Sequence, residues 1–254
     1  MRRLFLACAV LVSCLCGFSP PVFAQAVLPG TPTEEPPQPT WSGKIEFSFV
    51  SASGNSSART LGASGELDYH PDGWQITSRE SFIRSTSDAL VTAQSISSES
   101  RVSHHIAPRV DGYGQLDFLA NRFAGIDSRV ATDGGLAWDL LTNPHGQTLQ
   151  VTAGLGYSHE NNLDDGTKAF ATGNTGVQYV WHLSKTATIS EDGLFTASLV
   201  SRPDWRARNT LAVSAALNSI FSLKLSHRID FVNEPVPGFR KTDQLTSAAI
   251  VASF

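Results

Sequence analysis

A strict alternation of apolar or small residues with polar residues runs through most of the chain from Trp41 to Phe254. In the first such segment, one set of alternate positions holds Trp41, Gly43, Ile45, Phe47 and Phe49, and the other set holds Ser42, Lys44, Glu46 and Ser48. Successive side chains of a β-strand point to opposite faces, so a period of two predicts a strand with one apolar and one polar face. No segment of similar length shows the helical period. The pattern therefore predicts an all-β fold.

Clusters of turn residues divide this region into about twelve expected strands, each of roughly ten or more residues. The expected strands are 41–53, 58–69, 74–85, 90–105, 111–121, 127–140, 148–159, 168–183, 186–200, 208–217, 220–231 and 242–254. The alternation is weakest in the third, fourth and ninth of these, because Glu80, Glu99 and the run 191–193 interrupt it. The even number of strands favours an antiparallel β-barrel.

Large aromatic residues occupy the strand ends that would share one level if the first strand begins on the periplasmic side. They are Trp41, Tyr69, Trp74, Trp138, Tyr179, Trp181, Phe221 and Phe254. Such a girdle is expected where a transmembrane barrel meets the membrane interface, whereas a soluble barrel has no reason to collect aromatics at one end. The connections on this side are short and those on the other tend to be longer and polar, with 142–147 as an exception. We therefore expect a transmembrane antiparallel β-barrel of about twelve strands.

The first 40 residues have a different composition. Residues 1–24 begin with Arg2 and Arg3, continue through an apolar stretch and end with Val22, Phe23 and Ala24, which is typical of a secretory signal peptide. Cleavage there would remove all three cysteines, Cys8, Cys14 and Cys16, and would take the net charge from −4 to −6. Lipoprotein-type cleavage, which would leave a lipidated Cys14, is the alternative. Residues 25–40 hold five prolines and predict a disordered lead, so the barrel is expected over 41–254.

Charge and terminal sequence indicate which partners to expect. The chain is acidic and has no run of Lys or Arg beyond Arg2 and Arg3, which argues against nucleic-acid binding. Its last strand ends on Phe254, and a terminal phenylalanine on an amphipathic strand resembles the signal by which the barrel-assembly machinery recognises its substrates. We therefore expect contacts with that machinery and with outer-membrane lipids.

Candidate catalytic and metal-binding residues form no complete constellation. Serine hydrolase chemistry would draw on His104, His105, the run 158–160 and the pair 226–227, but sequence neighbours on a strand face opposite sides and no G-x-S-x-G elbow occurs. Residues 160–166 resemble a calcium loop, but the glycine is one position late and the closing glutamate is missing, so a solvated acidic loop is expected. The sequence predicts no catalytic residue, no metal site and no cofactor.

Charged residues at alternate positions predict a polar cluster in the lumen. Asp127, Arg129, Asp133 and Asp139 share one face of an expected strand and would need partners such as Arg59, Arg79, Lys224 or Arg228. We expect this lumen cluster to comprise Asp127, Arg129, Asp133, Asp139 and Arg228. A charge-satisfied polar core is the preferred interpretation, and a path for ions or substrate is the alternative.

Several local motifs occur together in a recognisable order. They are WSG at 41–43, SGNS at 53–56, FAGIDSR at 123–129, GGLAW at 134–138, GLGYSHE at 154–160 and PGFRKTD at 237–243. This series resembles the YdiY-like family, described as salt-induced outer membrane proteins with a domain of unknown function. The chain departs from the family in its Pro-rich lead and in the polar segment 95–100. The resemblance implies an outer-membrane barrel over 41–254 and supplies no catalytic residues.

Three functions are compatible with these expectations. The first is a structural or salt- and osmotic-stress-related protein of the cell outer membrane, in which the stress role is implied by the resemblance alone. The second is a small-solute channel, and the third is a lipid-modifying enzyme. Open aqueous channels belong mainly to barrels of roughly sixteen or more strands, so a bore of about twelve strands favours the structural role.

Overall fold

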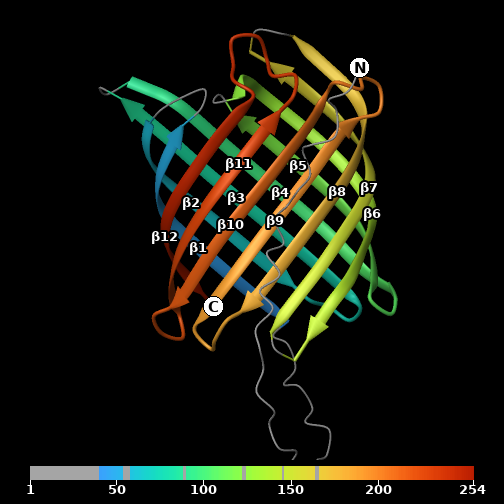
Figure 1. Cartoon of the computed structure of the whole chain (residues 1–254), viewed down its shortest axis with the longest axis vertical. Coiled ribbons are helices and arrows are strands. Elements are labelled where there is room, and N and C mark those ends of the chain that lie inside the picture. The colour runs from blue at the N-terminus through green and yellow to red at the C-terminus, as the bar shows by residue number, and fades with distance from the viewer. Residues whose placement is uncertain (1–39, 54–57, 88–89, 122–123, 145, 164–165) are drawn as a thin grey trace, which may run out of the picture. The chain divides into compact units, whose positions relative to one another are not determined.

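The computed structural model describes residues 40–53, 58–87, 90–121, 124–144, 146–163 and 166–254. These residues form twelve strands, and each strand is antiparallel to its neighbours. Because β1 also pairs with β12, the sheet closes into a barrel (Figure 1). The strands are β1 (Trp41–Ser53), β2 (Ala58–Tyr69), β3 (Trp74–Ser87), β4 (Leu90–Ala107), β5 (Val110–Asn121), β6 (Ile126–Asn143), β7 (Gln147–Asn162), β8 (Thr167–His182), β9 (Ala187–Ser198), β10 (Trp205–Ala216), β11 (Phe221–Val232) and β12 (Thr242–Ser253).

The all-β antiparallel barrel expected from the alternation is confirmed. The expected strand bounds agree with the observed ones to within three residues, and those of β1 and β2 agree fully. β6 and β7 are longer than expected, which reduces the expected turn 142–147 to residues 144–146. The expected signal peptide, residues 1–24 with Cys14, and the lead up to residue 39 lie outside the described residues. Among the described residues, no helix is long and apolar enough to cross a membrane.

The two ends of the barrel differ in their connections. The turn end carries the connections 70–73, 108–109, 144–146, 183–186 and 217–220, together with the start of β1 and the end of β12. The loop end carries the connections 199–204 and 233–241, which lie at the top of Figure 1. Every even-numbered strand therefore ends at the turn end, and every odd-numbered strand starts there.

Most apolar side chains point out of the barrel and most charged side chains point into it. Phe47, Leu61 and Leu155 are among the most exposed outward residues, at 67%, 75% and 66% of their surface. The inward positions of β1 to β4 instead bring charged residues such as Lys44, Glu66 and Arg79 into register. This distribution is the inverse of a soluble protein, whose apolar residues fill the core.

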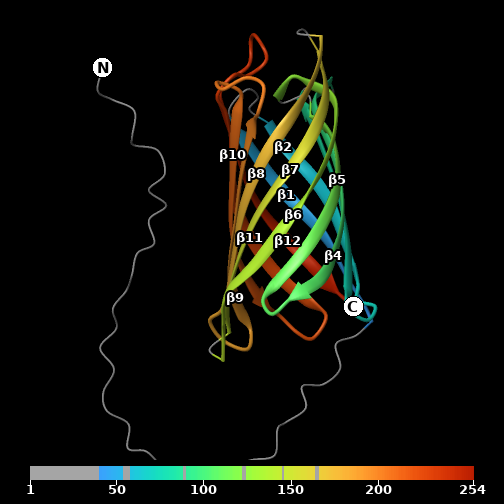
Figure 2. The same cartoon turned by 90° about the vertical axis from the view of Figure 1, so that its right-hand side faces the viewer.

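The barrel itself is flattened, since it is wide in Figure 1 and narrow in Figure 2. One wall contains β2 to β5, and the opposite wall contains β8 to β11. Glycines permit the sharp bend at β6 and β7 between the walls, because a Cβ at Gly135 would overlap the carbonyl of Ala153 and one at Gly156 would lie 2.6 Å from the carbonyl oxygen of Thr132. Flattening brings the charged inner faces of the two walls close together.

Candidate functional site: the charged lumen

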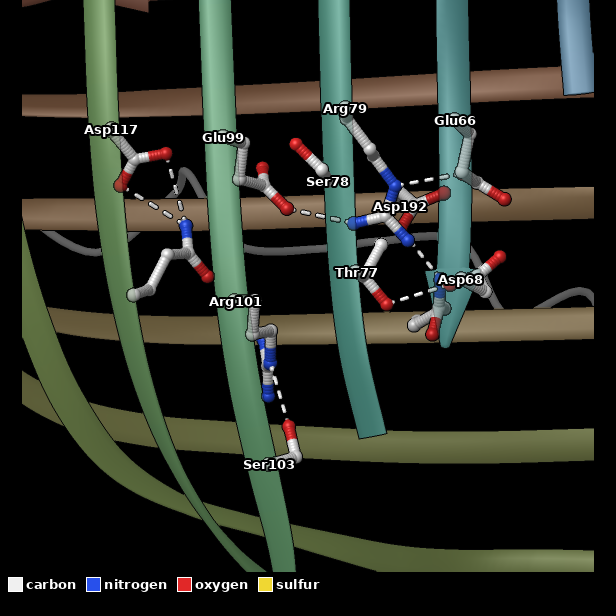
Figure 3. A network of polar contacts seen from close by, with 12 residues as sticks. Glu66, Asp68, Thr77, Ser78, Arg79, Glu99, Arg101, Ser103, Asp117 and Asp192 are labelled. Carbon is white, nitrogen blue, oxygen red and sulfur yellow. Dashed lines mark hydrogen bonds and ion pairs between the residues drawn. The ribbon is translucent and has the colours of Figure 1, made fainter. Parts of the chain in front are cut away.

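A row of charged side chains crosses the inner face of β1 to β5 at directly paired positions. We call this row the central ladder; its members are Lys44, Glu66, Arg79, Glu99 and Asp117. Lys44 Nζ lies 2.6 Å from Glu66 Oε1, and Arg79 joins Glu66 Oε2 (2.8 Å) to Glu99 Oε1 (2.7 Å). Figure 3 shows Arg79 between these two carboxylates. Positive and negative groups therefore alternate over the first four members of the ladder.

Asp117 interrupts this alternation. It faces Glu99 on the neighbouring strand, so two carboxylates stand side by side. The Gln115 amide donates to both Asp117 oxygens, at 3.1 and 3.0 Å (Figure 3). Within the described part of the chain Asp117 forms no ion pair, which leaves a negative charge on this wall.

The opposite wall carries its own charged groups. Arg208 Nε and Arg228 Nε each lie 2.6 Å from one oxygen of Asp230, so two guanidinium groups share one carboxylate. Asp192 on β9 interacts electrostatically with Arg79 on the opposite wall and accepts a 3.3 Å hydrogen bond from Gln178. Lys224 on β11 bonds to Glu46 on β1 at 2.9 Å.

Much of this charged lining is exposed to the interior of the barrel. The side chains of Lys44, Arg79 and Arg208 expose 55%, 43% and 38% of their surface, although all three point into the barrel. Arginine and lysine in a solid polar core would be covered by their neighbours. The middle of the lumen is therefore a space that water can enter.

A buried ion pair narrows the loop end. Glu160 on β7, whose side chain is 3% exposed, lies 2.7 Å from Arg206 Nη1 and 3.6 Å from Arg129 Nη1. β7 and β10 are separated by β8 and β9, so the Glu160–Arg206 pair passes over the inner faces of these two strands. The guanidinium of Arg206 also lies 5.9 Å from the ring centre of Phe170 on β8. The expectation of a solvated acidic loop is wrong for Glu160, because β7 continues to Asn162 and buries this carboxylate.

The connection 233–241 folds over the same end. Val236 in this connection is 6% exposed, and a Cβ at Gly125 would lie 3.0 Å from Val236 and 2.7 Å from the ring of Phe239. Gly125 precedes β6, which is six strands from β12 in either direction around the barrel. Its φ of +74° also suits glycine. The connection therefore spans the mouth, and a cavity of about 40 Å³ remains beneath it beside Glu160 and Arg206.

The structure spreads the expected lumen cluster along the barrel. Arg129 pairs with Glu160 and Arg228 with Asp230, whereas Asp139 accepts a 2.9 Å hydrogen bond from Gln150. Arg129 and Asp139 are ten residues apart on one strand, a separation of roughly 33 Å. Their common face therefore does not bring them together.

The other two members of the expected lumen cluster, Asp133 and Asp127, are not part of these ion pairs. Asp133 points inward and interacts with the Tyr113 hydroxyl and with Arg101. Asp127 is exposed, because a β-bulge between Ile126 and Ser128 interrupts the alternation at the start of β6. Of the partners considered from the sequence, Arg79 and Lys224 bind other carboxylates, and the side chain of Arg59 lies outside the described residues.

Sequence reasoning missed the pairing that organises the lumen. The alternation already placed Lys44 and Glu66 on polar faces, but only strand register shows that they meet Arg79 and Glu99. Arg206 falls in the expected connection between the strands 186–200 and 208–217, whereas β10 begins at Trp205. Residues that form an ion pair inside the lumen can be far apart in the sequence, so no local sequence pattern reveals them.

The girdle residues all lie near the turn end with outward register. Trp41 stacks on Tyr69 at 4.1 Å between ring centres, and Trp74 lies 4.3 Å from the ring of His104. The others are Trp138, Tyr179, Trp181, Phe221 and Phe254. An aromatic group that the sequence did not single out, Phe195, Trp205 and Phe231, packs on the outer face near the loop end.

Successive side chains of a strand point to opposite faces, and this keeps the candidate hydrolase and metal-binding residues apart. Ser158 points inward and is 4% exposed, whereas His159 is exposed on the outer face. His227 bonds to Thr246 on the outer face, while Ser226 bonds to Ser247 on the inner face. His105 lies 2.9 Å from Asp111. Within the described residues, no three His, Cys, Asp or Glu side chains are grouped to hold a metal ion.

Comparison with known proteins identifies the family. Residues 45–254 match DUF481, a family described as proteins of unknown function. The chain belongs to this family. DUF481 corresponds to the YdiY-like proteins, so the resemblance noted from the motifs is confirmed. No curated protein matched the chain.

Solved structures with a similar fold are outer-membrane barrels. The NanC porin has a TM-score of 0.56 and 8% identity, with 82% of this chain and 98% of that chain covered. An outer-membrane channel from Pseudomonas putida F1 has a TM-score of 0.53 and 11% identity over 89% and 100% of the two chains. The translocator domain of the autotransporter NalP from Neisseria meningitidis has a TM-score of 0.51 and 12% identity over 87% and 90%. At these identities the likeness establishes the fold alone.

Proposed function

We propose that this DUF481 protein is a narrow channel of the outer membrane for small polar or charged solutes. The observation that carries the proposal is the water-accessible central ladder. Lys44 and Arg79 point into the barrel yet expose 55% and 43% of their side chains. Ionic groups that remain solvated inside a barrel line a path through which small solutes can pass.

The outer surface supports the membrane location. Apolar side chains face outward along every strand, and a closed barrel leaves no unpaired strand edge for lipid to meet. Aromatic side chains such as Trp41 and Trp74 gather near the turn end, where an interfacial girdle would lie. The proposal therefore includes contact with outer-membrane lipids and recognition of the strand ending at Phe254 by the assembly machinery.

A structural or stress-related role is the second candidate, and the loop end favours it. The Glu160–Arg206 pair and the connection 233–241 narrow the mouth, and a barrel closed there would not conduct. Salt or osmotic response is implied by the family resemblance alone. Neither candidate assigns a catalytic role to Ser158 or His159, which face opposite sides of the sheet.

Two measurements on the purified full barrel test the proposal. Cell fractionation should recover the protein with the outer membrane, and its gel migration should change on boiling, as expected of a closed barrel. Planar lipid bilayers should then show discrete conductance steps for the wild type and larger steps for the Arg206→Gln variant. An outer-membrane barrel that gives no steps in either form would instead support the structural role.

A further inference from the structure

The two walls of the lumen carry unbalanced charges of opposite sign at facing positions. Asp117 on β5 forms no ion pair within the described residues, and its neighbour across the strand gap is a second carboxylate, Glu99. Arg208 on β10 and Arg228 on β11 share the single carboxylate of Asp230. One wall thus has a surplus of negative charge and the other a surplus of positive charge.

The topology sets these groups against each other. In the closed order of twelve strands, β4 lies opposite β10 and β5 lies opposite β11. Flattening of the barrel brings the walls close enough for Arg208 to interact electrostatically with both Asp117 and Glu99. The field between the walls is therefore transverse to the direction in which a solute would pass.

A transverse field acts differently on different solutes. An anion or a cation is attracted to one wall and repelled by the other, and a neutral solute gains little from either. A small zwitterion can turn its carboxylate toward the guanidinium pair and its ammonium group toward Asp117. Charges held in place by the barrel need no reorganisation to bind it, so this arrangement favours a zwitterion over a neutral solute of the same size.

We propose that the lumen selects small zwitterionic solutes, which are held between Asp117 and the Arg208–Arg228 pair as they pass. This inference rests on the proposed channel function and names the solute class that such a channel would take. The partial exposure of Arg208 (38%) and Arg228 (31%) leaves both guanidinium groups accessible from the lumen.

Swelling of proteoliposomes that contain the purified barrel tests the inference. The probes are glycine and glycolamide, which have the same molecular formula, but only glycine is a zwitterion. The wild type should admit glycine about threefold faster, the ratio expected from one solvent-screened charge interaction. In Asp117→Asn and in Arg228→Gln the ratio should fall to about one, because each change removes one side of the field.

Glu80→Gln provides the matched control. It also neutralises a carboxylate, but Glu80 points out of the barrel, where it accepts hydrogen bonds from Ser78 and Ser98. This variant should keep the wild-type ratio, and retained migration shift on boiling should show that every variant has folded. Equal rates for the two solutes in the wild type, or an unchanged ratio in Asp117→Asn, would overturn the inference and leave the channel standing. Absence of swelling with both solutes would overturn the channel and the inference with it.

Discussion

The aromatic ring of Phe254 lies over Gly43 on the outer face, where the last strand meets the first. Gly43 N donates to Phe254 O at 2.8 Å, and Phe254 N donates to Gly43 O at 3.0 Å. A Cβ at Gly43 would lie 2.6 Å from two carbons of the ring. Glycine therefore leaves the space that the terminal ring fills, and the ring covers backbone that would otherwise be bare. The closing seam of the barrel thus ends in a glycine–aromatic pair.

Substitution at this pair should weaken the seam. In Gly43→Ala the ring must move away, which we expect to cost about 1 kcal/mol of barrel stability, the range of one cross-strand pair. Phe254→Ala should lose the same packing. The measurement is the temperature at which the unboiled gel band converts to the boiled form. Gly65→Ala is the control, since a Cβ there meets only the Lys44 carbonyl, at 3.9 Å. Equal melting of the two glycine variants would contradict this role for the seam.

The ion pair at the loop end should both stabilise the barrel and restrict its mouth. Arg206→Gln leaves Glu160 buried with Arg129, at 3.6 Å, and with the electrostatic contribution of Lys168 on the neighbouring strand. We expect a loss of about 2 to 3 kcal/mol, less than for a fully stranded buried charge because Arg129 remains. Denaturant unfolding in detergent micelles measures this loss.

The double variant Glu160→Gln with Arg206→Gln isolates the pair. It removes both charges together, so its loss of stability should be smaller than the sum of the losses in Glu160→Gln and Arg206→Gln. Lys44→Gln is the matched control for an exposed ion pair, because the Lys44 side chain is 55% exposed. This variant should lose less than about 1 kcal/mol of barrel stability. Additive losses in the double variant would show that Glu160 and Arg206 are not coupled.

The barrel could be predicted from the sequence because a strand leaves a local trace. Alternation at Ile45, Phe47 and their neighbours is a property of consecutive residues, and most strand bounds followed from it. The lumen could not be predicted in this way. Whether Arg79 meets Glu66 depends on register between strands, and whether Arg206 meets Glu160 depends on how β7 and β10 are placed around the closed sheet. The bulge at Asp127 shows that one extra residue is enough to change the face on which the alternation would place a side chain.

Removal of Arg79 should change the ion preference of the channel. In Arg79→Gln the carboxylates of Glu66 and Glu99 lose their shared cation, and Asp192 loses the cation that it faces. The lumen becomes more negative, so its reversal potential in a salt gradient should shift toward cation selectivity. Because Arg79 is 43% exposed, the loss of stability should stay near 1 kcal/mol.

Arg84→Gln supplies the comparison for this variant. Arg84 lies on the same strand, but it is exposed on the outward face, so the same chemical change occurs outside the lumen. Its reversal potential should match that of the wild type. A shift of the same size in both variants would contradict this prediction. It would mean that a positive charge on β3 affects ion selectivity from outside the lumen as strongly as from inside it.

Glycine at the bend of the barrel should be required for closure. A Cβ at Gly135 would overlap the carbonyl of Ala153, which is backbone and cannot turn aside as a side chain can. Gly135→Ala must therefore displace β6 from β7, and we expect little heat-modifiable barrel and a low yield in the outer membrane. Gly114→Ala is the control, since a Cβ at that position has nothing within 4 Å. Alanine is otherwise the better residue in a strand by roughly 0.5–1 kcal/mol, so Gly114→Ala should keep or raise the melting temperature. Full assembly of Gly135→Ala would show that the bend tolerates a side chain and that the flattening has another cause.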